Sequence, residues 1–291
     1  MNKWTIKGYQ PERDFLLVCD WLRVRLATSL GLDGFALDRW ETQFSVQRML
    51  GRENNSALVF EADKIVGLIV AEGPDEFHFL RTKDVPELFQ LMCKWTQERI
   101  AKPFCLWSAS DNTWETEQLL LQGFVKQANQ CCCRSLVLQE TLKSIAAPAT
   151  YQILDVPITE YSWAQQQVKI DNGCFPWANS TVNSVQALLE MPSYRQRFHK
   201  GVISENGELV AFSVLWIDTQ NQLAVFEPVA TLQAHRRKGL AKALMNTLIR
   251  QAFDEGVRRF LVGSYSDEAH ATYQSVGFTD VNYIDLWRWQ T

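Results

Sequence analysis

An order of expected helices and strands that occurs twice constrains this chain more than any other feature. In each half the pattern predicts a helix, a hairpin, a strand, a helix, a strand, a helix and a last strand, with two early helices in the second half. In the first half these elements are expected at residues 15–26, 57–70, 76–80, 85–100, 104–108, 113–121 and 131–138. In the second half they are expected at 160–170 with 180–189, 202–218, 223–230, 239–255, 258–264, 268–276 and 281–289, after an extra strand at 151–156.

A Gly-Phe pair follows the last helix of each half, as Gly123-Phe124 and Gly277-Phe278. Chance can produce such a pair, because glycine often ends a helix and an apolar residue often follows it. The matching order of the elements nevertheless favours a duplicated unit of about 150 residues. We therefore expect two domains, residues 1–143 and 150–291, joined by a linker within Gln139–Thr150.

The composition indicates a folded protein of 291 residues, with 46% hydrophobic and 21% charged residues. The net charge of −4 argues against a general nucleic-acid binder. No apolar run is long enough for a membrane span, and the first residues do not resemble a signal peptide. We expect a cytoplasmic protein with no membrane partner, whose oligomeric state the sequence does not determine.

Three of the seven cysteines are consecutive, Cys131, Cys132 and Cys133. A metal or redox site is one interpretation, and three small buried strand residues in a reducing compartment are the other. The second is favoured because no Cys-x-x-Cys motif or histidine lies nearby.

The stretch from Leu223 to Gly256 carries the chemical signal. An apolar strand leads into a short basic loop with Gly239, and then directly into a strongly amphipathic helix. Such a loop brings the unpaired N–H groups and the positive end of a helix dipole beside a strand end. Gly239 and Ala241 let a diphosphate approach the backbone. Positive charge is added by Arg236, Arg237, Lys238 and Lys242. The alternative is a solvated basic turn that only caps a helix.

Two motifs in this half resemble the signatures of the GNAT superfamily of N-acetyltransferases. The first is Arg236-x-x-Gly239-x-Ala241, which in that family grips the coenzyme A pyrophosphate. The second is the helix with Ala269 and Tyr273 before Gly277-Phe278. The sequence of residues 226–229, which leads into the basic loop, resembles that of a bacterial subgroup with two tandem modules. This implies an α/β fold of two modules, each a twisted, mostly antiparallel sheet with a splayed central strand pair flanked by helices.

The resemblance also implies a cofactor, acetyl-CoA as the acyl donor, and no metal. Its pantetheine arm would pair with the backbone of Val229, Ala230 and Thr231. The phosphates would lie on the loop and the first turn of the helix, where Leu240 adds a backbone N–H group. Ser266 stands where many relatives have Asn, which puts one cofactor hydrogen bond in doubt.

Acyl transfer needs a proton for the leaving thiolate and an acceptor amine without its extra proton. Tyr273 matches the family's general acid, although a core tyrosine is the alternative. Glu227 is the candidate base, because we expect burial in an apolar strand to raise its pKa. The alternatives are an ion-paired or exposed glutamate. His235 and His270 are weaker candidates.

The expected function is transfer of an acetyl group to a primary amine of a small molecule or peptide, by direct attack in a ternary complex. An acyl-CoA-binding sensor or scaffold without turnover is the alternative. The acceptor amine itself is not encoded in any motif. Aromatic residues that could line its pocket, or simply pack, are Phe175, Trp177, Tyr194 and Trp216.

The first half resembles a copy that has lost catalysis. The stretch that corresponds to the basic loop, Leu80 to Pro86, contains no glycine, and Pro86 has no N–H group to offer. Counting back from Gly123-Phe124 places Leu119 at the position of the tyrosine, and leucine has no proton to donate. We expect this half to cover or shape the active half.

Overall fold

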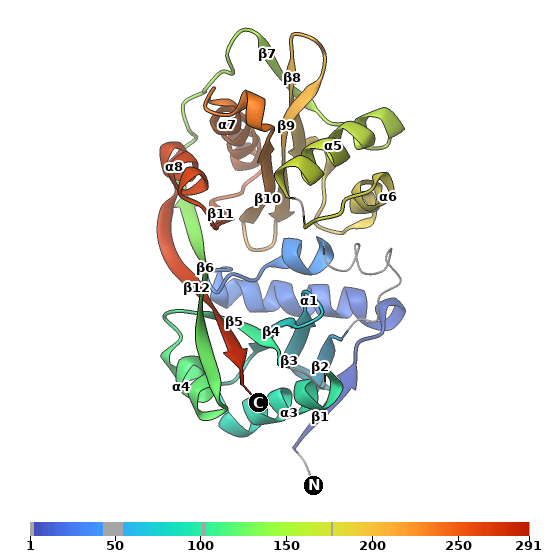
Figure 1. The fold of residues 1–291 in the computed structure, drawn as a ribbon, viewed down its shortest axis with the longest axis vertical. Helices are drawn as coiled ribbons and strands as arrows, with labels where there is room; N and C mark the ends of the chain where they lie inside the picture. Colours follow the sequence, from blue (N-terminus) through green and yellow to red (C-terminus); the bar gives the residue numbers. More distant parts are fainter. Residues whose placement is uncertain (1–2, 43–54, 101–102, 176, 291) are drawn as a thin grey trace. The chain divides into compact units, whose positions relative to one another are not determined.

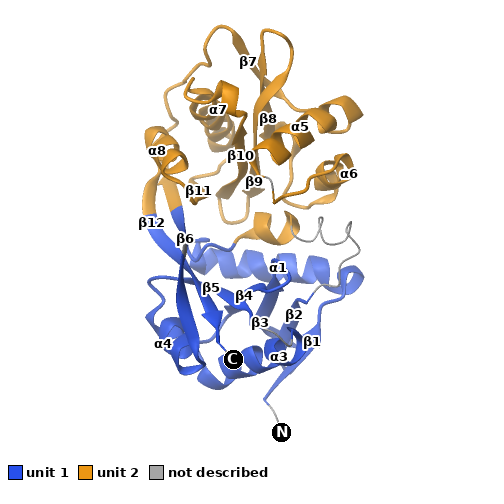
Figure 2. Ribbon diagram, in the orientation of Figure 1, with its two compact units in different colours: residues 1–35, 51–133, 281–291 blue, residues 36–50, 134–280 orange. Residues whose placement is uncertain are grey.

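The computed structural model describes residues 3–42, 55–100, 103–175 and 177–290. Over these residues the fold is mixed α/β, with twelve strands that pair mostly antiparallel (Figure 1). Contacts divide the chain into two compact units (Figure 2). Unit 1 comprises residues 1–35, 51–133 and 281–291, and unit 2 comprises residues 36–50 and 134–280.

Unit 1 has the hydrogen-bonded strand order β1-β2-β3-β4-β5-β12-β6. The strands β4 and β5, which are joined by the helix α3, pair in parallel. The strands are β1 (Trp4–Gly8), β2 (Ala57–Glu61), β3 (Lys64–Ala71), β4 (Glu76–Arg81), β5 (Cys105–Ala109), β6 (Phe124–Val137) and β12 (Thr279–Trp289). The helices are α1 (Pro11–Ser29), α3 (Pro86–Ile100) and α4 (Thr113–Leu121).

Unit 2 has the strand order β6-β11-β10-β9-β8-β7, and its parallel pair is β10 with β11. The strands are β7 (Tyr151–Asp155), β8 (His199–Ser204), β9 (Leu209–Asp218), β10 (Leu223–Thr231) and β11 (Arg259–Ser264). The helices are α5 (Tyr161–Cys174), α6 (Val182–Gln186), α7 (Leu240–Asp254) and α8 (Asp267–Val276), with short 3₁₀ turns at Ala187–Glu190, Gln196–Phe198 and Gln233–His235.

Each unit contains strand residues from the other half of the sequence. The last strand, β12, pairs with β5, so that Ile284 lies opposite Ala109 and Arg288 opposite Cys105. In return, β6 of the first half lies beside β11. The contact boundaries therefore differ from the sequence division into 1–143 and 150–291. That division describes the repeated order of elements and stays a prediction.

The core of unit 2 forms where apolar residues of α7 meet β8, β9 and β10. Helical spacing places Leu240, Leu244, Leu248 and Ala252 on one face, and all are buried. Phe226 and Phe278 belong to the same cluster. Figure 1 shows α7 and α5 on opposite sides of these strands. The cluster fixes α7 against β10, and so fixes the loop between them.

The expected helices and strands are present in the described residues, with small shifts at their ends. All three consecutive cysteines are buried and none forms a disulfide, in agreement with the strand interpretation. The strand β1 was not expected, and β6 begins at Phe124 rather than near Cys131. No helix of the described residues has the length and apolar character that a membrane crossing requires.

Candidate active site

The strands β10 and β11 separate partway along their length. They pair in parallel from Leu223 to Phe226, opposite Arg259 to Val262, and the pairing ends there. On its other side, β10 continues along β9 after a bulge between Phe226 and Val229. A bulge adds residues to one strand and bends it. Beyond Phe226, the side of β10 away from β9 is thus a strand edge to which an extended ligand can add.

Two side chains of β9 hold this bulge. Trp216 Nε1 donates to the Glu227 carbonyl at 2.6 Å, and Ser213 Oγ donates to the Pro228 carbonyl at 2.9 Å. A bulge removes carbonyls from the regular ladder, and a buried carbonyl without a partner is costly. These two donors therefore stabilise the point where β10 departs from β11.

The three residues expected to meet the pantetheine arm lie in this diverged part. Val229, Ala230 and Thr231 pair with Ser213, Phe212 and Ala211 of β9. Val229 and Thr231 are partly exposed, whereas Ala230 is buried. The Thr231 carbonyl accepts from Arg236 Nε at 3.0 Å and from Cys174 Sγ at 3.4 Å.

The basic loop ends in a left-handed residue that starts α7. Gly239 has φ of 76° and is the N-cap, a conformation that glycine adopts without strain. The first helical bond runs from Ala243 N to Gly239 O at 3.0 Å. No described residue accepts from the backbone N–H groups of Arg237 through Lys242. A Cβ on Gly239 would meet nothing within 4 Å. The loop is therefore an open cradle of donors suited to phosphate oxygens.

The basic side chains around this cradle have no acidic partners within the described residues. Arg236, Arg237 and Lys238 are exposed and Lys242 is half-buried. Within the described ranges, none of the four forms an ion pair with a carboxylate. Lys238 Nζ instead donates to the Tyr151 hydroxyl at 2.9 Å. The loop thus presents uncompensated positive charge next to unpaired N–H groups.

Tyr273 lies near the point where β10 and β11 separate. Its ring is buried on α8 and packs on Phe278, with ring centroids 6.3 Å apart. Phe278 in turn packs on Phe226, the last paired residue of β10, at 6.1 Å. Ser266 is the N-cap of α8, and its Oγ accepts from Ala269 N at 3.3 Å. This hydrogen bond gives Ser266 a helix-capping role. Contact between Ser266 and a cofactor stays a prediction.

The expectation that Glu227 is buried is wrong. Its side chain is exposed, because it lies in the bulge, where the inward and outward alternation of the strand is interrupted. Of the two histidines, His235 Nδ1 lies 3.0 Å from the Tyr151 hydroxyl and His270 Nδ1 lies 3.9 Å from Asp267 Oδ1.

The four aromatic candidates for an acceptor pocket form two separate pairs. The rings of Tyr194 and Trp216 are 6.0 Å apart, and those of Phe175 and Trp177 are 5.7 Å apart. Tyr194 is buried and its hydroxyl lies 3.0 Å from Nδ1 of His199. Burial lowers the pKa of His199 to about 3, so its ring is neutral. Trp177 is largely exposed.

Two buried acids of unit 2 were not anticipated. Glu41 accepts from Ser193 N at 2.8 Å and from Ser193 Oγ at 2.7 Å, which attaches the segment around residue 41 to unit 2. Asp171 on α5 is also buried, and this burial raises its pKa to about 7. In the sequence, the burial of Asp171 was indicated only by its position four residues after Gln167, on a helix face shared with Ala164.

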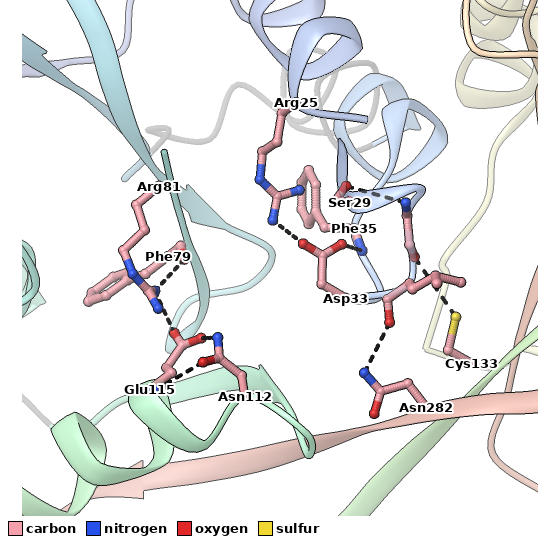
Figure 3. Close-up of polar contacts among 12 residues, drawn as sticks. Arg25, Ser29, Asp33, Phe35, Phe79, Arg81, Asn112, Glu115, Cys133 and Asn282 are labelled. Carbon is pink, nitrogen blue, oxygen red and sulfur yellow. Dashed lines mark hydrogen bonds and ion pairs between the residues drawn. The ribbon is translucent and has the colours of Figure 1, made fainter. Parts of the chain in front are cut away.

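In unit 1, the stretch Leu80 to Pro86 corresponds to the basic loop, and its Arg81 is paired with acidic residues (Figure 3). Arg81 donates to Glu115 at 3.0 Å and to Asp84 at 3.0 Å, and both groups of the Arg81–Glu115 pair are buried. The guanidinium also stacks on Trp114, at 4.4 Å from the ring centroid. Asn112 caps α4 and its Nδ2 donates to Glu115. Side chains of the protein itself thus compensate the charge of Arg81.

Among the described residues, no group of three or more histidine, cysteine or acidic side chains is placed to hold a metal ion. The residues at the end of β10 and the start of α7 do fit a coenzyme with phosphates and an extended amide arm.

Residues 164–278 match the sequence model of the acetyltransferase (GNAT) family. This segment of the chain is therefore a GNAT-family acetyltransferase domain. A comparison with curated protein sequences gave no significant match.

Solved structures share the fold over nearly the whole chain. A tandem GNAT protein from the clavulanic acid biosynthesis pathway superposes with a TM-score of 0.70 at 13% identity, covering 98% of both chains. A GCN5-related N-acetyltransferase from Sphaerobacter thermophilus gives 0.66 at 12% identity, covering 99% of this chain and 96% of that one. A GNAT-family acetyltransferase from Colwellia psychrerythraea gives 0.65 at 15% identity, covering 98% and 100%. At such identities the likeness shows the fold alone.

Proposed function

We propose that unit 2 transfers an acetyl group from acetyl-CoA to a primary amine of a small molecule or peptide. The observation that carries this proposal is the cradle of unpaired N–H groups from Arg237 to Lys242, surrounded by cations without carboxylate partners. It lies one short loop away from the free edge of β10. Coenzyme A has both a diphosphate, which would lie on the cradle, and an amide-containing arm, which would lie along the strand edge.

Acetyl-CoA, when bound, supplies the acetyl thioester. The edge at Val229–Thr231 orients its arm, and the cradle with Arg236, Leu240 and Ala241 binds its phosphates. Tyr273 is the general acid, giving its phenolic proton to the departing sulfur. Ser266 lies at the N-terminus of α8 and is the remaining candidate contact.

Glu227 is the proposed general base, acting directly or through a water molecule. Its exposure gives it access to an acceptor in solution, but leaves it without the burial that would tune its pKa. Replacing Glu227 with glutamine should flatten the acidic limb of the pH–rate profile. An unchanged limb in that variant would assign the proton to another group.

Unit 1 is proposed to be non-catalytic and not to bind acetyl-CoA. The Arg81–Glu115 pair occupies the position where unit 2 offers an unpaired cation, and Leu119 replaces the tyrosine. The tandem arrangement of two such modules is proposed for residues 1–143 and 150–291.

Titration calorimetry with acetyl-CoA, followed by a thiol-release assay over a panel of amines, tests these proposals. We expect one binding site per chain and release of free thiol that depends on the amine. Two sites per chain would contradict the proposal for unit 1. Binding without thiol release for any amine would indicate a sensor, and no binding would indicate a scaffold.

A further inference from the structure

The buried face of α5 carries polar groups that the packing does not explain. Of its four buried residues, Ala164 and Ile170 are apolar, whereas Gln167 and Asp171 are not. These two are only 2% and 7% exposed. They are four residues apart and therefore neighbours on the helix surface. A polar pair on the inward face of a helix is costly unless something satisfies it.

Asp171 has hydrogen-bonding partners but no counter-ion among the described residues, and Gln167 has an acceptor oxygen without a partner there. Asp171 is in hydrogen-bonding contact with Gln167 and Ser180, and no charged group of the described residues acts on it. Gln167 Oε1 is buried and has no hydrogen-bond partner among the described residues. The pair thus offers a carboxylate and a carbonyl oxygen, both acceptors, and no cation faces them.

The end of α5 contacts the diverged part of β10. Cys174 Sγ donates to the Thr231 carbonyl at 3.4 Å, and a Cβ on Gly173 would lie 3.6 Å from Leu232 Cδ2. Asp171 is one helical turn before Cys174, and α5 packs on β9 and β10. Asp171 is therefore about one helical turn away from the strand edge that we propose to hold the acyl donor.

We propose that Asp171 and Gln167 form the binding site for the protonated amino group of the acceptor. This inference rests on the proposed function, and it narrows the acceptor to amines that are cationic in solution. An ammonium group has three donors and a positive charge, and so matches two acceptors that lack a cation. Its charge also favours the ionised form of Asp171, which burial alone disfavours by raising its pKa to about 7.

A purely structural role for Asp171 predicts a different outcome. The carboxylate contacts Ser180, so it could simply hold the loop after α5. The two roles differ in how they depend on the charge of the acceptor. Loss of a structural contact affects all acceptors alike, whereas loss of an ammonium site affects cationic acceptors most.

The test compares Asp171→Asn with the wild type on paired amines. Each pair has a protonated alkylamine and a neutral arylamine of similar size, benzylamine with aniline being the smallest pair. We expect kcat/KM for the protonated member to fall about 10- to 100-fold and to fall much less for the neutral member. The dissociation constant of acetyl-CoA, measured by calorimetry, should stay the same.

Three matched variants separate the carboxylate from its surroundings. Gln167→Met keeps the size but removes the carbonyl, and should give a smaller loss for the protonated amines. Ser180→Ala removes only the hydroxyl partner, and Glu160→Gln removes an exposed acid at the start of α5. Glu160→Gln should leave kcat/KM unchanged within about threefold.

The outcomes distinguish this inference from the proposed function. An equal loss for protonated and neutral amines in Asp171→Asn, or no loss, overturns the ammonium site alone. A wild-type enzyme that acetylates only neutral amines also overturns it. A wild-type protein that binds acetyl-CoA but acetylates no amine refutes the proposed function itself.

Discussion

The two loops that follow the diverging strands, after β4 in unit 1 and after β10 in unit 2, are both basic, but their charges have different partners. Arg81 is bonded to Glu115 and Asp84, and Lys83 is bonded to Glu61 at 2.6 Å. In the second loop, Lys238 is held by a phenol, and none of the neighbouring described cations has a carboxylate partner. Acidic partners within the protein stabilise the first loop, whereas the second loop, without such partners, can bind an anionic ligand.

The helices that follow show the same contrast at equivalent positions. Counted from the first helical residue, the third position is Glu115 in α4 and Ala269 in α8. The seventh position is Leu119 in α4 and Tyr273 in α8. In one helix a carboxylate neutralises the loop and an apolar side chain fills the core. In the other, a small residue stands at the third position, and the seventh carries the phenol that we propose as the proton donor.

The largest effect should come from Tyr273→Phe. If the phenol protonates the leaving sulfur, kcat should fall by roughly 10²- to 10⁴-fold, the usual contribution of a positioned acid. Acetyl-CoA affinity should change little, because the transferred proton matters in the transition state. Steady-state kinetics and calorimetry measure the two quantities.

Tyr161→Phe, at an exposed tyrosine of the same unit, is the control and should leave kcat unchanged. An unchanged kcat in Tyr273→Phe would show that Tyr273 is only a core residue. The contrast between Leu119 and Tyr273 would then have no catalytic meaning.

The next effect concerns stability in unit 1. Glu115→Leu leaves Arg81 buried without its buried partner, which should lower the free energy of unfolding by about 3 kcal/mol. Denaturant unfolding measures this change. Asp84→Leu removes the exposed partner of the same arginine, and should cost less than about 1 kcal/mol. Similar losses in both variants would show that burial of the pair does not matter.

Gly239→Val tests the cradle directly. A β-branched residue at φ of 76° is strained and would distort the N–H groups that face the ligand. Acetyl-CoA affinity should fall about 100-fold by calorimetry, as expected when several charged hydrogen bonds are weakened. Gly256→Val is matched in conformation, with φ of 93° and nothing within 4 Å of its Cβ, but lies at the other end of α7. Equal losses of affinity in both would attribute the effect to strain.

The smallest effect should follow from Lys238→Ala. Removing one exposed cation from a phosphate site should weaken acetyl-CoA binding about tenfold at low salt, and less as salt screens the charge. Lys200→Ala, in the same unit but paired with Asp155, should not change the affinity. A loss that does not depend on ionic strength would indicate that Lys238 acts through Tyr151 rather than through its charge.

Periodic patterns predicted most of the elements, because helices and strands bury one face at a fixed spacing. The loop at Arg236–Ala241 could also be located from the sequence, because its proposed phosphate site consists of consecutive backbone groups. Burial at Glu227 was predicted wrongly, because alternation along a strand fails at a bulge.

Other features depend on partners far away in the sequence. The neutralisation of Arg81 requires Glu115, from a different helix, and local patterns do not pair such residues. The burial of Asp171 was hidden because a carboxylate on a helix reads as a solvent-exposed residue. The exchange of β6 and β12 was also missed, because each strand has the same local pattern whichever neighbour it joins.

That exchange sets the order in which the protein can mature during synthesis. Residues 281–291 belong to unit 1, yet the ribosome adds them after all the other residues of both units. Strand β5 of unit 1 therefore lacks its neighbour β12 until residues 281–291 have been synthesised, although domains usually fold as they emerge. For the same reason, a protease that cuts the linker at 139–150 would nick the chain without separating two complete halves.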